Sequence, residues 1–495
     1  MGTYITFPEL LLWLPLLGGI ACFFMKDAKP VKAWSLIISL ITLLVSVGSL
    51  LYADNSKYPT YNSVNYIWLK YLGNSFYLGL DGMGRILTFL IALGFPIIFL
   101  ATYKNNYKSP SAFYGLMLLA QAGMMGVFIS MDALLFYFFW ELALIPVYFL
   151  CSRWGGERRI PATFKFFVYT FVGSLLMLVG IIYIYLHTNQ RSFEDGTISA
   201  HSFALSSFYN ASLSASDQNW LFWLFFAAFA VKMPVFPFHT WQPDTYDQAP
   251  TSVTMVLSGL MVKMGLFGVI RWLIPILPLA TIKFTNIVMV LSIAGIIYAS
   301  FLAMVQDNLK RLVAYSSIAH IGLMCAAIFA MNTLSVQGVM LQMFNHGINI
   351  IGLWIVIDII EKQTGVKHIS KLKGIANKAP VLTIMLLVIA LANIALPLTN
   401  GFVGEFMMFG GLFSFNSWYA VAASLSIILA AVYTLRMIRN VFYGETNSLT
   451  ENIKDISFNQ QFVLGFIVLL IFILGVYPQP VIDLTKSAVT SLLKI

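Results

Sequence analysis

The stretch NWLFWLFFAAFAVKMPVFPFH occupies residues 219–239 and combines a long apolar run with a lysine and two prolines. Its length matches the roughly 20 residues that a helix needs to cross the hydrocarbon core of a bilayer. Lys232 lies inside the run, and Pro234 and Pro237 interrupt its helical pattern. The stretch therefore predicts a membrane-spanning helix that is broken beside a buried charge.

Apolar stretches of similar length recur along the whole chain of 495 residues, of which 59% are hydrophobic and 10% are charged. A water-soluble domain carries about 25% charged residues, so this composition, with a mean hydropathy of +0.83, excludes one. Backbone groups in lipid must find partners within the chain, which leaves helices or a closed barrel, and the unbroken apolar runs favour helices. We therefore predict an all-α polytopic membrane protein with about fourteen spans. They lie near residues 5–24, 31–53, 86–103, 111–130, 133–150, 161–186, 219–239, 250–271, 284–305, 311–331, 336–360, 379–411, 417–441 and 459–478.

The distribution of lysine and arginine predicts the orientation of these spans. Eighteen of the 29 basic residues fall in one set of alternate connections, eight fall in the other set with the termini, and three fall inside spans. By the positive-inside rule the richer side is cytoplasmic, which places both termini on the outer side. The first span has no basic segment before it and no cleavage site, so we interpret it as a retained helix. The net charge of +9 follows these connections and does not indicate nucleic-acid binding.

Two blocks of five spans, residues 111–271 and 284–441, have similar lengths. N-terminal helices in 1–103 precede them, and a C-terminal helix in 442–495 follows, all within a single membrane domain. Because five is an odd number, the second block enters the membrane from the opposite side. The pattern therefore predicts two inverted five-helix repeats.

Each block also contains an interrupted span. Pro234 and Pro237 interrupt the first, and Pro397 and Gly401 interrupt the second. Broken helices at matching places in two inverted repeats indicate a transport site near the membrane midplane.

Four charged residues fall deep inside predicted spans, namely Glu141, Lys232, Lys263 and Glu405. A charge at the bilayer centre costs about 2.5 kcal/mol or more, so each one needs a partner or a purpose. Lys232 and Glu405 are 173 residues apart, which is also the separation of the two block starts. The symmetry therefore predicts one charge beside each helix break.

Two interpretations of these charges remain open at this point. In the first, Glu141 and Lys232 form an ion pair that only holds helices together. In the second, the charges form a proton relay. Burial among apolar neighbours disfavours the charged form of a lysine, and a nearby carboxylate favours it. A change at the carboxylate would then decide whether the lysine keeps its proton.

Three histidines, His239, His320 and His346, also fall beside or inside spans. An imidazole can take and release protons near neutral pH, although each ring could equally be an uncharged donor to a backbone carbonyl. A metal or haem site would need a close histidine pair or a histidine–carboxylate helix motif, and the sequence has neither. The polar residues around them could carry water-linked transfer or could pack helices; they are Tyr315, Ser316, Ser317, Asn345 and Asn349.

The remaining candidates are surface or structural features. Cys22, Cys151 and Cys325 are scattered and form no CxxC pair, which argues against a thiolate metal or iron–sulfur site. Asp81 and Arg85 lie at the start of a span, and we expect them to pair or to face water.

Three segments together resemble a known family. KMPVFPFHTWQPDTYDQAPTSVTMVLSGLMVKMG (232–265), QDNLKRLVAYSSIAHIG (306–322) and WELALIPVYFL (140–150) are similar to the antiporter-like membrane subunits of respiratory complex I, the NADH–quinone oxidoreductase. The resemblance covers roughly residues 110–445. Subunits of Mrp antiporters and of membrane-bound hydrogenases share this core. Glu405 in GFVGEF resembles the M-type subunits, whereas the L and N types carry lysine there.

The resemblance implies a role for each of the buried residues. Glu141 and Lys232 would form the Glu–Lys pair, Lys263 would be the central lysine, and Glu405 the terminal acid of the relay. His320, His346 and His239 would be further relay members, with His239 of second rank. The form HTWQPDTYDQAP (239–250) departs from the HTWLPDAHTEAP-like form of the family, which leaves the polar details of this loop open.

The resemblance also implies what the chain works with. It implies a proton-translocating subunit in the bacterial inner membrane with no cofactor of its own. NADH or another donor, FMN, iron–sulfur clusters and quinone would bind to partner subunits. The expected partners are other membrane and peripheral subunits of the complex, above all neighbouring antiporter-like subunits, and lipid, with no nucleic acid. An Mrp-type cation/proton antiporter subunit, a membrane-bound hydrogenase subunit and a passive scaffold are the alternatives.

Overall fold

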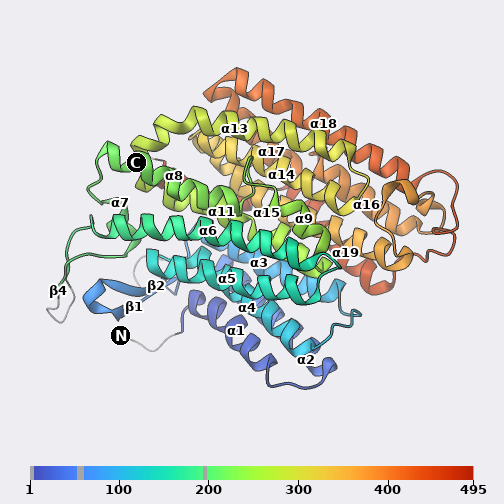
Figure 1. The fold of residues 1–495 in the computed structure, drawn as a ribbon, viewed down its shortest axis with the longest axis horizontal. Coiled ribbons are helices and arrows are strands. Elements are labelled where there is room, and N and C mark those ends of the chain that lie inside the picture. Colours follow the sequence, from blue (N-terminus) through green and yellow to red (C-terminus); the bar gives the residue numbers. More distant parts are fainter. Residues whose placement is uncertain (1–4, 53–60, 193–197, 494–495) are drawn as a thin grey trace.

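Long helices make up most of the computed structural model, which describes residues 5–52, 61–192 and 198–493 (Figure 1). Eleven helices in these residues are long and apolar enough to cross a membrane, which confirms the predicted helical polytopic fold. The predicted number of fourteen spans is not confirmed, because the remaining expected spans are short or broken.

The helices follow the order of the predicted spans. The N-terminal helices are α1 (Phe7–Cys22), α2 (Ala28–Leu51) and α3 (Gly82–Ala101). The next are α4 (Pro110–Ile129), α5 (Ala133–Trp154), α6 (Arg159–Tyr185), α8 (Ala215–Lys232), α9 (Trp241–Gln248) and a composite helix over residues 251–276. The last are α13 (Pro278–Val305), α14 (Leu309–Phe329), α15 (Thr333–Thr364), α16 (Pro380–Asn393), α17 (Asn400–Phe415), α18 (Ser417–Phe442), α19 (Phe458–Val476) and α20 (Gln479–Leu492).

The composite helix changes its hydrogen-bond pattern along its length. Its segments are α10 (Thr251–Met255), η2 (Val256–Met261), α11 (Lys263–Gly268), η3 (Val269–Leu273) and α12 (Ile274–Ile276), of which η2 and η3 are π-helical. π-Helical turns are rare and occur mostly at functional sites. Lys263 lies between the two, a feature that the sequence did not indicate.

The chain leaves the helical conformation at both expected interruptions. Between α8 and α9 it does so over residues 233–240, which include Pro234 and Pro237. Between α16 and α17 it does so over residues 394–399, which include Pro397. Gly401 lies in the first turn of α17 and not in the break itself. A Cβ there would lie 2.2 Å from the Ala392 carbonyl oxygen, so the glycine permits the close approach of α17 to the end of α16.

Short polar side chains fix where several of the helices begin. Asp81 caps α3 by accepting a hydrogen bond from the Gly84 amide at 2.9 Å. Asp132 caps α5 by accepting from the amides of Leu134 and Leu135 at 3.0 and 3.2 Å. These bonds satisfy amide groups that have no partner inside the helix.

The buried centre of the bundle consists of the composite helix, α14 and α15, whose apolar windows are enclosed by other helices throughout. By contrast, α2, α6, α18 and α19 are largely exposed at the periphery. Large apolar side chains such as Phe164 on α6 and Ile428 on α18 are exposed there, as expected for surfaces that face lipid or a partner. The central helices are therefore the ones that can isolate charged side chains from the surroundings.

Smaller elements that the sequence did not predict lie at both ends of the helices. Strands β1 (Ser63–Leu69) and β2 (Asn74–Gly79) form an antiparallel hairpin. The turn η1 (Lys70–Leu72) joins these two strands. The other short elements are β3 (Arg191–Ser192), β4 (Ile198–Ser199), α7 (Leu205–Tyr209), η4 (Ile369–Lys371) and η5 (Ile375–Asn377).

In Figure 1 the chain begins beside this hairpin and ends at the same end of the bundle, away from the hairpin. The Phe7 amide at the start of α1 donates to the Tyr61 carbonyl at 2.9 Å. Helix α20 packs against α3 and α15, and Leu484 lies directly against Gly82 at the start of α3. We call this end of the bundle the hairpin end, and the opposite end, which carries the connection 361–378, the loop end.

Candidate functional site

Lys232 is the last residue of α8, at the first helix break. It is buried, with 2% of its surface exposed, and its Nζ lies 5.3 Å from the centroid of the Trp140 ring. Glu141 follows Trp140 on α5, yet within the described residues neither Glu141 Oε1 nor Lys232 Nζ has a hydrogen-bond partner. The structure therefore places the two groups on facing helices without the direct hydrogen bond of a simple ion pair. The negative end of the α8 dipole and the Trp140 ring both favour the cation.

Lys263 is fully buried on the composite helix. Its Nζ donates to the Ser258 carbonyl oxygen at 3.0 Å and lies 2.9 Å from His346 Nδ1. Ser258 belongs to the π-helical segment η2, so the local change of register presents this carbonyl to the lysine. His346 Nε2 is buried without a hydrogen-bond partner among the described residues.

The next contacts extend from His346 to Glu405. The rings of His346 on α15 and His320 on α14 have centroids 5.7 Å apart. His320 Nδ1 lies 3.2 Å from Glu405 Oε1 on α17, and both side chains are buried. Lys263, His346, His320 and Glu405 therefore form a continuous row across four helices, which we call the central row.

Three of the sequence-predicted members, Glu141, Lys232 and His239, lie outside this row. His239 is in the first break, where its ring packs against Phe236 and Tyr298, and its Nδ1 is buried without a partner in the described part of the chain. Lys232 belongs to α8, which packs closely against α11. A Cβ at Gly265 on α11 would lie 2.7 Å from the Phe229 carbonyl of α8. The helices that carry Lys232 and Lys263 are thus in direct contact.

Two further polar residues, which the sequence did not identify, contact the central row. Gln342 Nε2 donates to Glu405 Oε1 at 3.4 Å, and Asn393 Nδ2 lies 3.4 Å from His320 Nε2. Gln342 precedes His346 by four residues on α15, so the spacing of a helix face could have identified it. Asn393 has no such signal, because it reaches His320 only through tertiary packing at the end of α16.

The asparagines Asn345 and Asn349 serve packing at the second break. Asn345 Nδ2 donates to the Asn400 carbonyl at 2.6 Å, and the side-chain amides of Asn349 and Asn400 exchange two hydrogen bonds of 3.0 Å. They tie α15 to the start of α17. Of the two roles considered for these residues, the contacts support helix packing.

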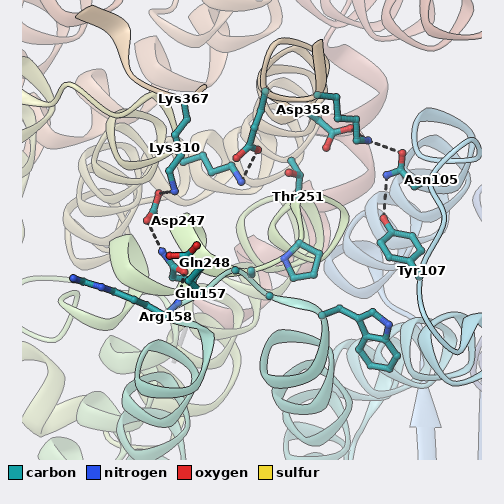
Figure 2. A pocket seen from close by; sticks show the side chains of 17 residues that line it. Asn105, Tyr107, Glu157, Arg158, Asp247, Gln248, Thr251, Lys310, Asp358 and Lys367 are labelled. Carbon is teal, nitrogen blue, oxygen red and sulfur yellow. Dashed lines mark hydrogen bonds and ion pairs between the residues drawn. The ribbon is translucent and has the colours of Figure 1, made fainter. Parts of the chain in front are cut away.

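At the loop end a cavity of 640 Å³ opens where the composite helix begins. Ion pairs line it (Figure 2): Lys310 Nζ lies 2.7 Å from Glu361 Oε2, and Lys367 Nζ lies 2.6 Å from Asp247 Oδ1. Four acidic and four basic residues line this cavity, which we call the vestibule; they are Glu157, Asp247, Asp358, Glu361, Arg158, Lys310, Lys362 and Lys367.

The charges of the vestibule are balanced, so they favour occupancy by water and by small ions of either sign over selective binding of an anion. Asp247 is the most constrained of its acids. Burial opposes ionisation of Asp247, but hydrogen bonds from Lys367 and Asn308 outweigh that cost and hold the pKa of Asp247 below its ordinary value. Within the described residues no group of three or more His, Cys, Asp or Glu side chains could hold a metal ion.

Comparison with known proteins gives a consistent assignment. A sequence profile described as NADH:quinone oxidoreductase/Mrp antiporter, TM, matches residues 130–430. The chain belongs to this family. Its membership confirms the resemblance that the segments around Lys232 and Lys263 indicate.

Within the family, several relatives with substantial identity are M-type subunits. The NADH-quinone oxidoreductase subunit M of Rickettsia bellii is 35% identical over 97% of each chain, and that of Escherichia coli is 32% identical over 97% of this chain and 96% of its own. The F(420)H(2) dehydrogenase subunit M of Methanosarcina mazei is 34% identical over 98% of each chain. The M-type resemblance that Glu405 indicates is therefore confirmed.

Solved structures of the family share the fold. A chain of respiratory complex I from Thermus thermophilus has a TM-score of 0.87 at 26% identity, covering 98% of this chain and 99% of its own. A chain of the Mrp complex from Dietzia sp. has a TM-score of 0.84 at 17% identity, covering 98% and 97%. The second likeness concerns the fold alone.

Proposed function

We propose that this chain translocates protons as an antiporter-like subunit of an NADH–quinone oxidoreductase, with quinone reduction elsewhere in the complex driving the movement. The observation that carries the proposal is the central row, in which Lys263, His346, His320 and Glu405 contact one another in succession inside the bundle. Ionisable groups at membrane depth are costly and characteristically mark ion pathways. A passive scaffold would be more stable with apolar side chains at the same positions.

The contacts support the following order of proton transfer along the row. The Lys263 ammonium donates to His346 Nδ1 across 2.9 Å. An imidazole that takes a proton on one nitrogen can release a proton from the other, and His346 Nε2 is the nitrogen left without a partner among the described groups. His320 then lies within reach of Glu405 through Nδ1, and the carboxylate accepts the proton.

Glu141 and Lys232 act on this row through charge. Because they are not directly hydrogen-bonded, a change of charge on Glu141 alters the proton affinity of Lys232 without breaking a rigid pair. The helices of Lys232 and Lys263 are packed together, so a proton on one lysine disfavours a proton on the other. His239, in the first break, would be a second-rank member that exchanges protons with water near Lys232.

The proposed partners follow from the relatives. Other membrane and peripheral subunits of the complex would surround the chain, including neighbouring antiporter-like subunits, and the exposed apolar faces of α6 and α18 would meet them or lipid. Those partners would bind the electron donor, which is NADH or an alternative such as the F(420)H(2) in the name of the Methanosarcina relative. They would also bind FMN, iron–sulfur clusters and quinone. The chain itself would carry no redox centre.

The proposed setting is the inner membrane of a bacterium. The excess of basic residues assigns the loop end to the cytoplasm and both termini to the outer side. We also propose that residues 111–271 and 284–441 are inverted repeats. The matching breaks after α8 and α16 support that division.

Replacing Glu405 by glutamine tests the function directly. The amide keeps the size of the side chain and its contacts with His320 and Gln342 but cannot exchange a proton. In proteoliposomes with the assembled complex, we expect normal electron transfer at first turnover and fewer protons pumped per electron pair. The exposed Glu445→Gln variant is the matched control. Pumping at full stoichiometry in the Glu405→Gln complex would overturn the proposal.

Two alternative functions predict different results in the same vesicles. A secondary antiporter would exchange Na⁺ for H⁺ when the purified chain is reconstituted alone, without any electron donor. A scaffold would tolerate Glu405→Gln, Lys232→Ala and Glu141→Ala at full pumping as long as the complex assembles.

A further inference from the structure

A buried arginine occupies the hairpin end of the helix that carries Lys263. Arg271 lies in the π-helical segment η3 and is 7% exposed. Lys263, Phe267 and Arg271 succeed one another at intervals of four residues, so they follow one face of the composite helix. The Arg271 guanidinium lies 5.3 Å from the centroid of the Phe267 ring. Beyond Lys263, this face therefore presents first an aromatic ring and then a fixed cation.

Contacts from two other segments hold Arg271 in place. Its Nη2 donates to Asp81 Oδ2 at 2.5 Å, and the Tyr209 hydroxyl of α7 donates to the Arg271 carbonyl at 3.0 Å. Asp81 is itself fixed as the cap of α3. Helix α20 covers this corner, since a Cβ on Gly82 would lie 1.8 Å from the Leu484 carbonyl oxygen. The partner of Asp81 is thus a residue 190 positions away. From the sequence we expected Asp81 and Arg85 to pair or to face water.

The pair is oriented with its positive member inward. The Arg271 side chain is 8% exposed, whereas that of Asp81 is 30% exposed. The interior of the bundle therefore faces the guanidinium, and the carboxylate lies on the solvent side. Arginine cannot give up its proton in a protein, so it cannot act as a step in a relay. A fixed cation of this kind opposes the passage of protons and other cations through a polar path.

We propose that Arg271, oriented by Asp81, is an electrostatic barrier that prevents protons on Lys263 from escaping along its helix to the hairpin end. This inference rests on the proposed role of Lys263 as a proton carrier. The helix is then asymmetric: the vestibule opens at its loop end, and an aromatic ring with a fixed positive charge closes its hairpin end. A proton on Lys263 would then transfer to His346, whose Nδ1 lies 2.9 Å from the Lys263 Nζ.

Passive proton leak measures the barrier separately from pumping. The assembled complex in proteoliposomes, with no electron donor, is given a membrane potential by K⁺ and valinomycin, and a trapped pH dye reports proton entry. In the double variant Asp81→Asn/Arg271→Gln both charges are removed together, which avoids leaving one buried and unpaired. We expect its leak to rise at least about tenfold, the lower end of the range over which local fields alter ion rates. Arg271→Lys, which keeps the cation, should leak no more than the unaltered complex.

The chain offers a closely matched control pair. Lys310 and Glu361 have side chains that are 6% and 30% exposed, close to the values for Arg271 and Asp81, but they line the vestibule. The Lys310→Gln/Glu361→Gln variant should leave the leak unchanged, because the barrier at the other end remains. Asp81→Asn alone should also leave the proton leak unchanged, because the Arg271 cation remains. A raised leak in this variant would show instead that the barrier depends on the intact ion pair.

The outcomes separate this inference from the proposed function. If the double variant assembles and leaks no more than the unaltered complex, the barrier is refuted. If the double variant does not assemble, Arg271→Gln alone, whose amide can still donate to Asp81, decides in the same way. A leak in these variants together with full pumping in Glu405→Gln would retain the barrier at Lys263 and reject Glu405 as the terminal acid of the row.

Discussion

His346 is the point at which the central row can be cut with least disturbance elsewhere. Its Nδ1 is the side-chain partner of Lys263, and its ring faces that of His320. Leucine at this position fills much of the ring volume but neither accepts nor donates a proton. In the His346→Leu variant the lysine keeps its bond to the Ser258 carbonyl and loses its connection to the rest of the row.

The structure sets the size of the expected effect. A positioned acid–base group contributes about 10²–10⁴-fold to the rate of a proton transfer, so transfer from Lys263 should slow by at least about 100-fold, or about 2.7 kcal/mol in the barrier. The lost hydrogen bond to a charged group should cost about 1.5–3 kcal/mol of stability. Such a loss is compatible with a folded subunit in a large assembly. Pumping should therefore fail well before folding does.

The assay compares electron transfer and proton pumping in the same proteoliposomes. We expect the His346→Leu complex to oxidise donor while the number of protons moved per electron pair falls. His368→Leu is the control, because His368 is an exposed histidine that pairs with Asp307 at the surface. If His346→Leu pumps with undiminished stoichiometry, protons do not pass through this ring and the order of transfer is wrong.

Two further predictions concern packing and pH. A Cβ at Gly123 would lie 2.4 Å from a backbone nitrogen of α5, so Gly123→Val should lower the stability by about 1–3 kcal/mol and reduce the melting temperature of the complex. Gly465→Ala is the control and should leave that temperature unchanged, because no atom lies within 4 Å of a Cβ there. The lowered pKa of Asp247 means that its bonds to Lys367 and Asn308 stabilise the fold above the ordinary carboxyl pKa, about 3.9, and that this contribution is lost as the pH falls through the lower folded pKa. The protection of the amides in the connection 361–378 against hydrogen exchange, taken relative to the intrinsic rate at each pH, should therefore fall only at that acid pH. Asp247→Asn should make this protection low and independent of pH in this range.

Much of the fold can be predicted from the sequence because a lipid environment restricts which backbone conformations are stable. Apolar runs of bilayer length must be helices, and Pro234, Pro237 and Pro397 cannot continue them. The helices and breaks lie close to the expected positions for this reason. The four acidic and basic residues in the spans are equally visible, since each is rare at that depth.

The contacts among those residues could not be predicted, because they depend on packing between distant segments. His320 and Glu405 are 85 residues apart, and Asp81 and Arg271 are 190 apart. Helix α20 was missed because it is short and amphipathic, with Asp483 and Lys486 among its apolar residues, and therefore lacks a long apolar run. The π-helical segments beside Lys263 depend on hydrogen-bond register, which no residue type in VLSGLM or VIRWL specifies.

The central claim is that a proton resides on Glu405 during each cycle. Time-resolved infrared difference spectroscopy of the pumping complex, with Glu405→Gln as the reference, follows the carbonyl stretch of a protonated carboxyl group. We predict a band that appears and decays with each turnover and is absent from the glutamine variant. A complex that pumps while the Glu405 carboxyl keeps one protonation state throughout would contradict the account.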